Sequence, residues 1–306
     1  MNNRTISYLL LMFSIIINGC DLMSWKSASP SASQQILVEG YLSAMNPLPS
    51  IRIVHVGLLY DYYKGDQIGI GDAEVRIFKL TATGKTDKSY PYKLEDEGTG
   101  SYTPLDQDLV QPGATYKLSI QISGRPTPIT SQTTVPDTFA ILSETPATPE
   151  YPSDDPFSLL ASRSNYPGRK ALYIFNALAR DTSLTNYLPY YKQDIGQDPL
   201  YQMYERMNHP SGVIREENYN TTSSGDIELV VPWNTFVFYG RNRIVVNAID
   251  DNIYDFLRSQ QVQSGDSNLT PGEIPNIISH IEGAIGVFGS LSSDTTATFV
   301  LKRREE

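Results

Sequence analysis

Acidic side chains gather in two places where their oxygens could bind a metal ion. One group consists of Asp250, Asp251 and Asp255, and a second lies between residues 266 and 273. Carboxylate oxygens are ligands that Ca²⁺ prefers, so both groups are candidate calcium sites. Neither group has the spacing of an EF-hand loop. Helix capping and a solvated loop are therefore the favoured interpretations, and we expect no metal cofactor.

The three histidines, His55, His209 and His280, lie in three separate sequence contexts. His280 and Glu282 form an H-x-E pair, but no other Cys or His lies near them to complete a zinc site. The sequence contains no nucleophile elbow, H-E-x-x-H, Walker loop or C-x-x-C motif. A glycan hydrolase would need two facing carboxylates, and spacing among 34 acidic residues selects no such pair. We therefore expect a protein that is not an enzyme.

Tyrosine is unusually frequent, with 20 residues in a chain of 306. Its ring offers a large rigid apolar face and a hydrogen-bonding hydroxyl, which suit sugar stacking and protein interfaces. Packing of the rings over the core is the alternative interpretation. The candidate residues for binding a glycan or peptide ligand are Tyr187, Tyr190, Tyr191, Tyr201, Tyr204 and Trp233.

The single cysteine, Cys20, follows a charged and then apolar N-terminal segment. Arg4 is the only charged residue before it, and the apolar run 6–17 is shorter than the ~20 residues that a membrane-spanning helix needs. This is the arrangement of a signal peptide. The sequence Ile17-Asn18-Gly19-Cys20 resembles a bacterial lipobox, where the thiol receives a diacylglycerol and the signal is cut before the cysteine. We therefore expect residues 1–19 to be removed and a covalent lipid on Cys20 to anchor the protein.

The rest of the N-terminal segment and the overall charge point to an anchored, acidic protein. Residues 20–34 are rich in Ser, Ala and Pro and have no sustained hydrophobic period, which predicts a flexible tether after the lipidated cysteine. The chain carries 24 basic and 34 acidic residues, for a net charge of −10. Such a field repels phosphate backbones, so we expect no nucleic-acid partner.

Strand patterns dominate residues 35–143. Apolar and polar residues alternate in segments that are separated by turns rich in glycine and proline, at 49–60, 73–80 and 115–122. This pattern predicts an antiparallel, Ig-like sandwich. The order of the segments 72–78, 98–105 and 109–121 resembles the small transthyretin-like or carboxypeptidase-regulatory-like sandwich.

A second β-rich domain with one or two short helices is expected over residues 157–306. Residues 144–156 combine prolines and acids without an apolar stripe, and we interpret them as a linker. Beyond the linker, β-branched and aromatic residues concentrate in strand-like runs, at 170–179, 226–233, 235–240, 243–250 and 296–302. Together the two parts predict a mainly β chain.

One helix is expected near residues 251–263 of the second domain. Asp250 or Asp251 is its candidate N-cap, and Ile253, Phe256 and Leu257 form its apolar face. A glycine-rich stretch follows at 282–290. Its spacing is not that of a dinucleotide-binding loop, and we interpret these glycines as allowing a β-bulge or a close approach of two backbones.

Several segments together resemble one family. They are "ILVEGYLS", "GDAEVRIF", "GSYTP", "PGATYKLSI", "DDNIYDFLR" and "ISHIEGAIGVFGS". With the lipobox, they resemble the Bacteroidota outer-membrane lipoproteins catalogued as domain of unknown function four-two-four-nine (DUF4249). The resemblance implies a lipid-anchored protein on the periplasmic or cell-surface face of the outer membrane, often encoded near TonB-dependent receptors. It implies no reaction and no catalytic residues.

The leading expectation is a non-catalytic lipoprotein that binds a ligand or partner as an accessory to a TonB-dependent uptake system. A structural subunit of a pilus or adhesion fibre is one alternative, because anchored pilins also pair two transthyretin-like sandwiches. A glycan hydrolase is the second alternative. The sequence does not identify the ligand or the partner protein.

Overall fold

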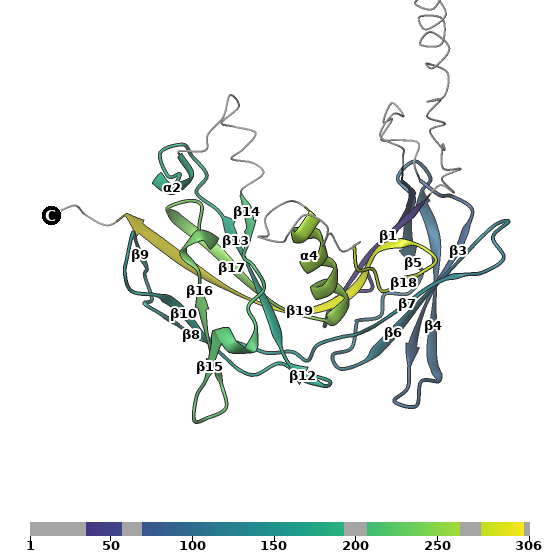
Figure 1. Ribbon diagram of the computed structural model, residues 1–306, viewed down its shortest axis with the longest axis horizontal. Coiled ribbons are helices and arrows are strands. Elements are labelled where there is room, and N and C mark those ends of the chain that lie inside the picture. Colours follow the sequence, from purple (N-terminus) through teal and green to yellow (C-terminus); the bar gives the residue numbers. More distant parts are fainter. Residues whose placement is uncertain (1–34, 57–68, 193–206, 264–276, 303–306) are drawn as a thin grey trace, which may run out of the picture. The chain divides into compact units, whose positions relative to one another are not determined.

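The computed structural model describes residues 35–56, 69–192, 207–263 and 277–302 (Figure 1). Contacts place Ile36–Glu306 in one compact unit. Its ordered elements are mostly strands, with few and short helices. The prediction of a mainly β chain is therefore confirmed. The predicted signal peptide, Cys20 and the tether lie outside the described residues.

Seven strands form the first half of the described chain. They are β1 (Ile36–Ser43), β2 (Ile51–His55), β3 (Ala73–Leu80), β4 (Thr86–Asp96), β5 (Ser101–Pro104), β6 (Thr115–Ile122) and β7 (Ile129–Thr134). Inward and outward residues alternate along them, so that Tyr116, Leu118 and Ile120 of β6 are buried while Lys117 is exposed. This is the period-two pattern that predicted strands 73–80 and 115–122, and both have the predicted limits.

Hydrogen bonding runs without a break through these strands in the order β1-β2-β5-β4-β3-β6-β7-β18, where β18 is Ile281–Glu282. Neighbours in this series pair antiparallel. The inner face of the sheet packs on one hydrophobic core, which includes Ile53, Ile77 and Tyr102. The outer positions of β6, β7 and β18 are left to polar side chains, and these build the pocket described below.

The second half contains more and shorter elements. They are β8 (Ile141–Thr145), β9 (Glu150–Tyr151), β10 (Phe157–Ala161), β11 (Asn165–Tyr166), β12 (Arg169–Lys170), β13 (Leu172–Ala179), α2 (Pro189–Lys192), β14 (Asn208–Pro210), η1 (Glu216–Asn218), β15 (Tyr219–Thr221), β16 (Ile227–Val231), η2 (Trp233–Thr235), β17 (Gly240–Ile249), α4 (Asp251–Gln263) and β19 (Ile285–Lys302). Strands β14-β13-β17-β19 continue the large sheet, and β15-β16-β10-β8 form a separate one.

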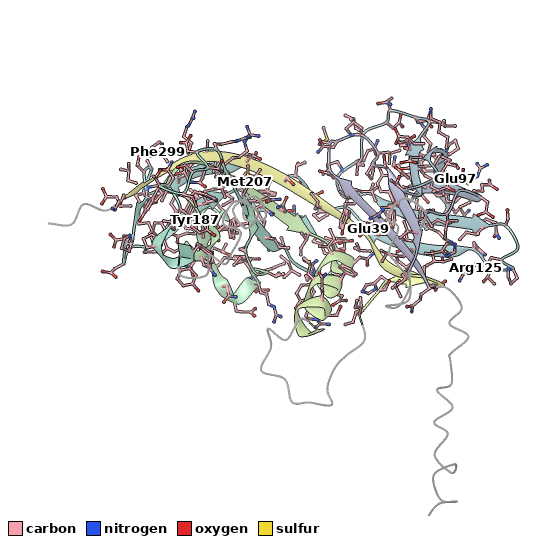
Figure 2. All side chains as sticks on the ribbon, turned by 90° about the horizontal axis from the view of Figure 1, so that it is seen from above. Glu39, Glu97, Arg125, Tyr187, Met207 and Phe299 are labelled. Carbon is pink, nitrogen blue, oxygen red and sulfur yellow. The ribbon has the colours of Figure 1, made fainter. Side chains whose placement is uncertain are left out.

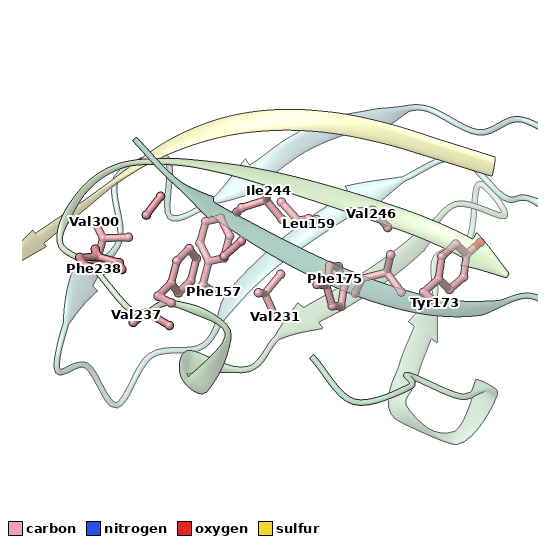
Figure 3. Close-up of a cluster of buried hydrophobic side chains, with 14 of the residues drawn as sticks. Phe157, Leu159, Tyr173, Phe175, Val231, Val237, Phe238, Ile244, Val246 and Val300 are labelled. Carbon is pink, nitrogen blue, oxygen red and sulfur yellow. The ribbon is translucent and has the colours of Figure 1, made fainter. Parts of the chain in front are cut away.

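A second hydrophobic core lies between these two groups of strands. Phe157 and Leu159 of β10 meet Phe175 of β13 and Ile244 of β17 there (Figure 3). The segment 235–240 contributes Phe236 and other buried residues to this core, but it is mostly not a strand. Its run of apolar residues predicted a strand because burial alone does not distinguish a strand from a buried irregular segment.

The long strand β19 pairs with β1 through its first residues and with β17 through its later ones. The prediction placed a strand only at 296–302, whereas β19 begins at Ile285, within the glycine-rich stretch. The interpretation of these glycines as points of close backbone approach is confirmed at Gly286. This residue has φ +115°, and a Cβ on it would lie 2.1 Å from the carbonyl oxygen of Val38.

The predicted linker, residues 144–156, contains the end of β8 and the short strand β9. Strand β9 pairs parallel with the end of β19 through Glu150 and Tyr151. The domain limits at 143 and 157 stay a prediction.

Helix α4 begins and ends where the sequence predicts it. Asp250 is its N-cap, because its Oδ1 atom accepts a hydrogen bond of 2.9 Å from the amide of Ile253. Ile253 is buried, and Phe256 and Leu257 pack partly buried against the same small cluster on β13, β17 and β19. No helix in the described segments combines the length and apolar character that a membrane crossing takes.

Candidate functional site

A polar pocket of about 350 Å³ lies on the outer face of β6, β7 and β18. Strand register sets its rows, because Lys117 on β6 pairs with Gln132 on β7 and Thr130 on β7 pairs with Glu282 on β18. Every lining residue has a polar side chain. The lining residues are Lys117, Thr130, Ser131, Gln132, His280 and Glu282.

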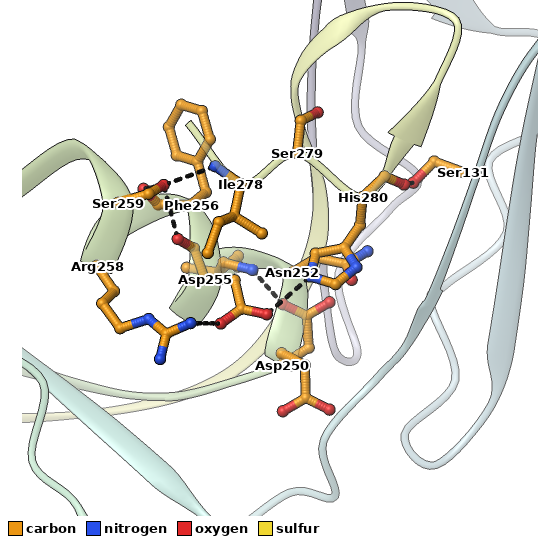
Figure 4. Close-up of polar contacts among 12 residues, drawn as sticks. Ser131, Asp250, Asn252, Asp255, Phe256, Arg258, Ser259, Ile278, Ser279 and His280 are labelled. Carbon is orange, nitrogen blue, oxygen red and sulfur yellow. Dashed lines mark hydrogen bonds and ion pairs between the residues drawn. The ribbon is translucent and has the colours of Figure 1, made fainter. Parts of the chain in front are cut away.

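Two of the lining side chains are held in place by neighbours. The hydroxyl of Thr130 donates to Oε2 of Glu282 at 3.0 Å. Nε2 of His280 lies 2.8 Å from Oδ2 of Asp255 on α4, and Arg258 on the next turn pairs with the other carboxylate oxygen of Asp255 at 3.0 Å (Figure 4). A ligand would thus meet an imidazole and a carboxylate that are already oriented, which lowers the entropy lost on binding.

The backbone beside these side chains is also fixed. The hydroxyl of Ser131 donates to the carbonyl of His280 at 2.7 Å. Nη2 of Arg125 donates to the carbonyl of Gly283 at 2.5 Å. Gly283 has φ +83°, a conformation that favours glycine and lets the chain turn from β18 into β19. The glycine-rich stretch therefore shapes one wall of the pocket.

Two other polar groups in the pocket have no side-chain partner within the described residues. Among the described residues, neither the ammonium group of Lys117 nor the side-chain amide of Gln132 makes a hydrogen bond or ion pair with the protein. The two residues pair across β6 and β7. Their donors and the amide oxygen face solvent and are available to a ligand.

Helix α4 is tied to β7 behind the pocket. The side-chain amide of Asn252 donates to the carbonyl of Gln132 at 2.8 Å and to the carbonyl of Phe288 at 2.7 Å. Asn252 thereby bonds to backbone acceptors of both β7 and β19. The contact fixes the helix from which Asp255 orients His280.

Asp250 is buried beside this contact, at 1% exposure. Its Oδ2 atom contacts the hydroxyl of Thr133 on β7, and that hydroxyl lies 2.6 Å from the hydroxyl of Ser290 on β19. Burial raises the pKa of Asp250 to about 6, while the contact with the Thr133 hydroxyl and hydrogen bonds from the amides of Ile253 and Ser290 act in the opposite direction.

The candidate calcium ligands do not converge on one point. Asp250 turns into the protein toward Thr133, and Asp251 forms an ion pair of 2.6 Å with Arg169. Asp255 binds Arg258 and His280. No group of three or more His, Cys, Asp or Glu residues that could hold a metal occurs in the described part of the chain. In the structure these carboxylates cap a helix and form ion pairs.

The candidate tyrosines are separated by burial. Tyr187 is fully buried next to Phe238, with ring centres 5.1 Å apart, and Tyr191 is 7% exposed and donates to the carbonyl of Asn234. Figure 2 labels Tyr187 close to the short helix α2. Both rings therefore serve the second core. Tyr190 is 60% exposed, with its ring centre 5.0 Å from that of Tyr191.

The remaining candidates divide between the core and the segments without a description. Trp233 is partly buried against the second core, and its ring centre lies 5.6 Å from that of Tyr151. Tyr201 and Tyr204 lie outside the described residues. Of the four candidates within the described residues, the structure thus leaves Tyr190 as the ring that is mostly exposed, and its role in binding stays a prediction.

Sequence reasoning did not select the pocket. His280 and Glu282 were considered only as zinc ligands, Lys117 lay within the predicted strand 115–122 without a role, and Thr130 and Gln132 were not considered. Their proximity depends on which strand lies beside β7, and strand order cannot be deduced from local alternation. The available signal was the alternation of polar residues along 115–122, which left Lys117 on the outer face of its strand.

Comparisons with known proteins identify a family and give only distant structural similarities. The profile of a family described as "Domain of unknown function (DUF4249)" matches residues 26–297. No curated protein matches the chain. A trypsin-activated alpha-2-macroglobulin from Escherichia coli is 11% identical, with a TM-score of 0.19 over 71% of this chain and 14% of that one. A tetra-tandem repeat of a large adhesion protein is 9% identical, with a TM-score of 0.23 over 85% of this chain and 50% of that one.

Proposed function

The chain belongs to the family described as Domain of unknown function (DUF4249), and we propose that it is a lipid-anchored, ligand-binding accessory of an uptake system in the outer membrane. The observation that carries the binding role is the polar pocket on β6, β7 and β18. The pocket adjoins the segment 280–290, which is also the most distinctive part of the family resemblance. A TonB-dependent receptor is the partner that this resemblance implies.

The chemistry of the pocket favours a short peptide as the ligand. Lys117 offers a positive charge and Glu282 a negative one, so the pocket matches a molecule that carries both a carboxylate and an ammonium group. Gln132 can both donate to and accept from a peptide unit. No Phe, Tyr or Trp is among the described lining residues, and stacking on such a ring is what usually selects a sugar.

A binding role without catalysis accords with the same lining. Among the described lining residues Glu282 is the one carboxylate, whereas hydrolysis of a glycosidic bond takes two that face each other. His280 is bonded to Asp255, but no Ser, Cys or Thr in the described contacts bonds to its ring as a nucleophile would. We therefore propose a recognition role for the pocket residues.

The anchor is proposed from the N-terminal sequence. A signal-like segment ends at Cys20, and the Ser- and Pro-rich residues that follow have the composition of a tether. The two or three acyl chains of a bacterial lipoprotein, at ~0.8 kcal/mol per buried methylene, would make the attachment effectively permanent. A permanently held binding protein raises the local concentration of its ligand near a receptor in the same membrane.

Calorimetric titration tests the binding role with two defined probes, trialanine and maltotriose. Trialanine should bind the purified full chain with a dissociation constant of about 1 mM or tighter, which corresponds to roughly −4 kcal/mol. Lys117→Glu should weaken this binding at least about tenfold, because it replaces the partner of the peptide carboxylate with a like charge. Maltotriose should not bind.

The matched control is Lys93→Glu, which makes the same charge change at an exposed position on β4, outside the pocket lining. Its affinity for trialanine should equal that of the wild type. Absence of trialanine binding, or equal binding by Lys117→Glu, would overturn the proposed role of the pocket. Binding of maltotriose that Lys117→Glu abolishes would keep the pocket but replace the peptide with a sugar.

A further inference from the structure

Four oxygen atoms form a buried row between α4, β7 and β19. The row starts at Oδ2 of Asp250, which contacts the hydroxyl of Thr133. The hydroxyl of Thr133 lies 2.6 Å from the hydroxyl of Ser290, and the hydroxyl of Ser290 lies 2.9 Å from the carbonyl oxygen of Thr134. Three contacts thus join four oxygens, and each contact is short enough to be a hydrogen bond.

The number of hydrogen atoms in this row decides its protonation state. Each of the three contacts requires one hydrogen, but the hydroxyls of Thr133 and Ser290 supply only two. The carbonyl of Thr134 supplies none, and an ionised carboxylate also supplies none. With Asp250 ionised, one contact would place two oxygens against each other without a proton. With Asp250 protonated, the carboxyl donates to Thr133, Thr133 donates to Ser290, and Ser290 donates to the carbonyl of Thr134.

We infer that the folded arrangement carries a proton on Asp250, and that this proton acts as a pH-sensitive latch which holds α4 against β7 and β19. When the proton leaves, the row loses one of its three hydrogen bonds and buries a negative charge. Burial raises the pKa of Asp250 toward neutrality, which agrees with the count of hydrogens. The latch would therefore respond in a mildly acidic range.

The groups around Asp250 do not offer a positive charge that would neutralise the ionised carboxylate. Asp251 is the neighbouring charge on α4, and it raises the pKa of Asp250 further. The β11–β12 hairpin brings Tyr166 and Arg169, and the guanidinium of Arg169 pairs with Asp251 and the carbonyl of Ile249. Strand β7 faces Asp250 with the neutral hydroxyl of Thr133, and β19 faces it with the neutral backbone amide of Ser290.

Helix α4 connects the latch to the pocket. Asn252 makes the adjoining contacts with the carbonyls of Gln132 and Phe288, and Asp255 orients His280 from the same helix. A looser α4 would therefore release the imidazole from its oriented position. The proton on Asp250 follows from the fold alone and does not depend on the proposed function, because no ligand takes part in it.

The test compares the pH dependence of unfolding for the wild type, Asp250→Asn and Asp251→Asn, each as the purified full chain. Asn fits the protonated pattern, since its amide donates to Thr133 while its oxygen still caps the helix. Because the folded pKa is raised, the wild-type folding constant should fall by up to roughly 100-fold as the pH rises from about 4 to above 6. Asp250→Asn should lack this fall, and Asp251→Asn should retain it.

A direct titration of the Asp250 carboxyl carbon by NMR separates the latch from a purely structural role. The expected midpoint is about 6, well above that of an ordinary aspartate. Thr133→Ser, which keeps the hydroxyl, should preserve both the midpoint and the pH profile. A midpoint near ~3.9, the ordinary value, would overturn the inference. So would parallel pH profiles for the wild type and Asp250→Asn.

Discussion

At the residue scale, Asp250 performs two tasks with one side chain. Oδ1 caps α4 through the amide of Ile253, and Oδ2 begins the row of hydroxyls that reaches Ser290. The rise of its pKa from 3.8 to about 6 corresponds to about 3 kcal/mol. That stabilisation is fully present below the unfolded pKa and is lost as the pH rises through the folded one.

The two tyrosines at 187 and 190 should respond oppositely to truncation. Tyr187→Ala should destabilise the protein by about 3–5 kcal/mol, because it empties a fully buried ring site beside Phe238. Tyr190→Ala should change the free energy of unfolding by less than about 0.5 kcal/mol, since that ring is mostly exposed. Urea unfolding of both variants measures the difference. Equal losses would contradict the assignment of Tyr187 to the core and Tyr190 to the surface.

Single residues could be predicted where local chemistry determines their role. Asp250 as N-cap and Ile253 as a buried helix residue follow from the order of residue types along the chain. The tyrosine cluster was harder, because enrichment in one residue type is compatible with packing and with binding. Tyr187 and Tyr191 lie in the core while Tyr190 faces solvent, and that depends on the path of the backbone between Tyr187 and Tyr191.

At the element scale, the glycine-rich start of β19 allows α4 to lie against the sheet. A Cβ on Gly289 would approach Cγ1 of Ile253 to 2.5 Å and Oδ1 of Asp250 to 3.0 Å. Both atoms belong to the first turn of the helix or to its cap. Any side chain at 289 would therefore push α4 away from β19 and disturb the latch and the orientation of His280 together.

Gly289→Ala should cost roughly 1–3 kcal/mol of stability through this overpacking. Gly212→Ala is the matched control, because a Cβ there meets nothing within 4 Å, and its effect should stay within about 0.5 kcal/mol. Chemical denaturation of the two variants measures the contrast. If Gly289→Ala were as stable as Gly212→Ala, the close contact between α4 and β19 would be wrong.

Elements were predictable where one face is buried and the other exposed. Strands β3 and β6 show that alternation and were predicted to the residue. Strand β19 was predicted only at its end, because its first residues are buried in succession and include glycines. The segment 235–240 gave the reverse error, since it is apolar and buried but mostly irregular. In both cases packing against other elements overrides local propensity.

At the scale of the whole molecule, two hydrophobic cores share one continuous sheet. Strand β19 pairs with β1 beside the first core and with β17 beside the second. The segments 250–258 and 280–290 are both part of the family resemblance. They contact each other through Asn252 and Phe288 and through Asp255 and His280, and the pocket lies next to them. The family match spans nearly all of the described chain, so it includes both cores.

The overall class of the fold could be predicted, but not the convergence that makes the pocket. Lys117 and His280 are far apart in the sequence, and they line one pocket because β18 adds to the edge of β7. That pairing is non-local and leaves little trace in the alternation of either strand. The anchor at Cys20, by contrast, was predicted from a local motif and stays a prediction.

The most direct test of an anchored peptide-binding accessory measures uptake of labelled trialanine by cells. In these cells the gene is deleted and then replaced by a copy that encodes either the wild type or one variant. The wild type and Lys93→Glu should restore uptake. Cys20→Ala, without its lipid anchor, and Lys117→Glu, with an altered pocket, should both fail. Unchanged uptake after deletion of the gene, or full restoration by both Cys20→Ala and Lys117→Glu, would contradict the proposed function.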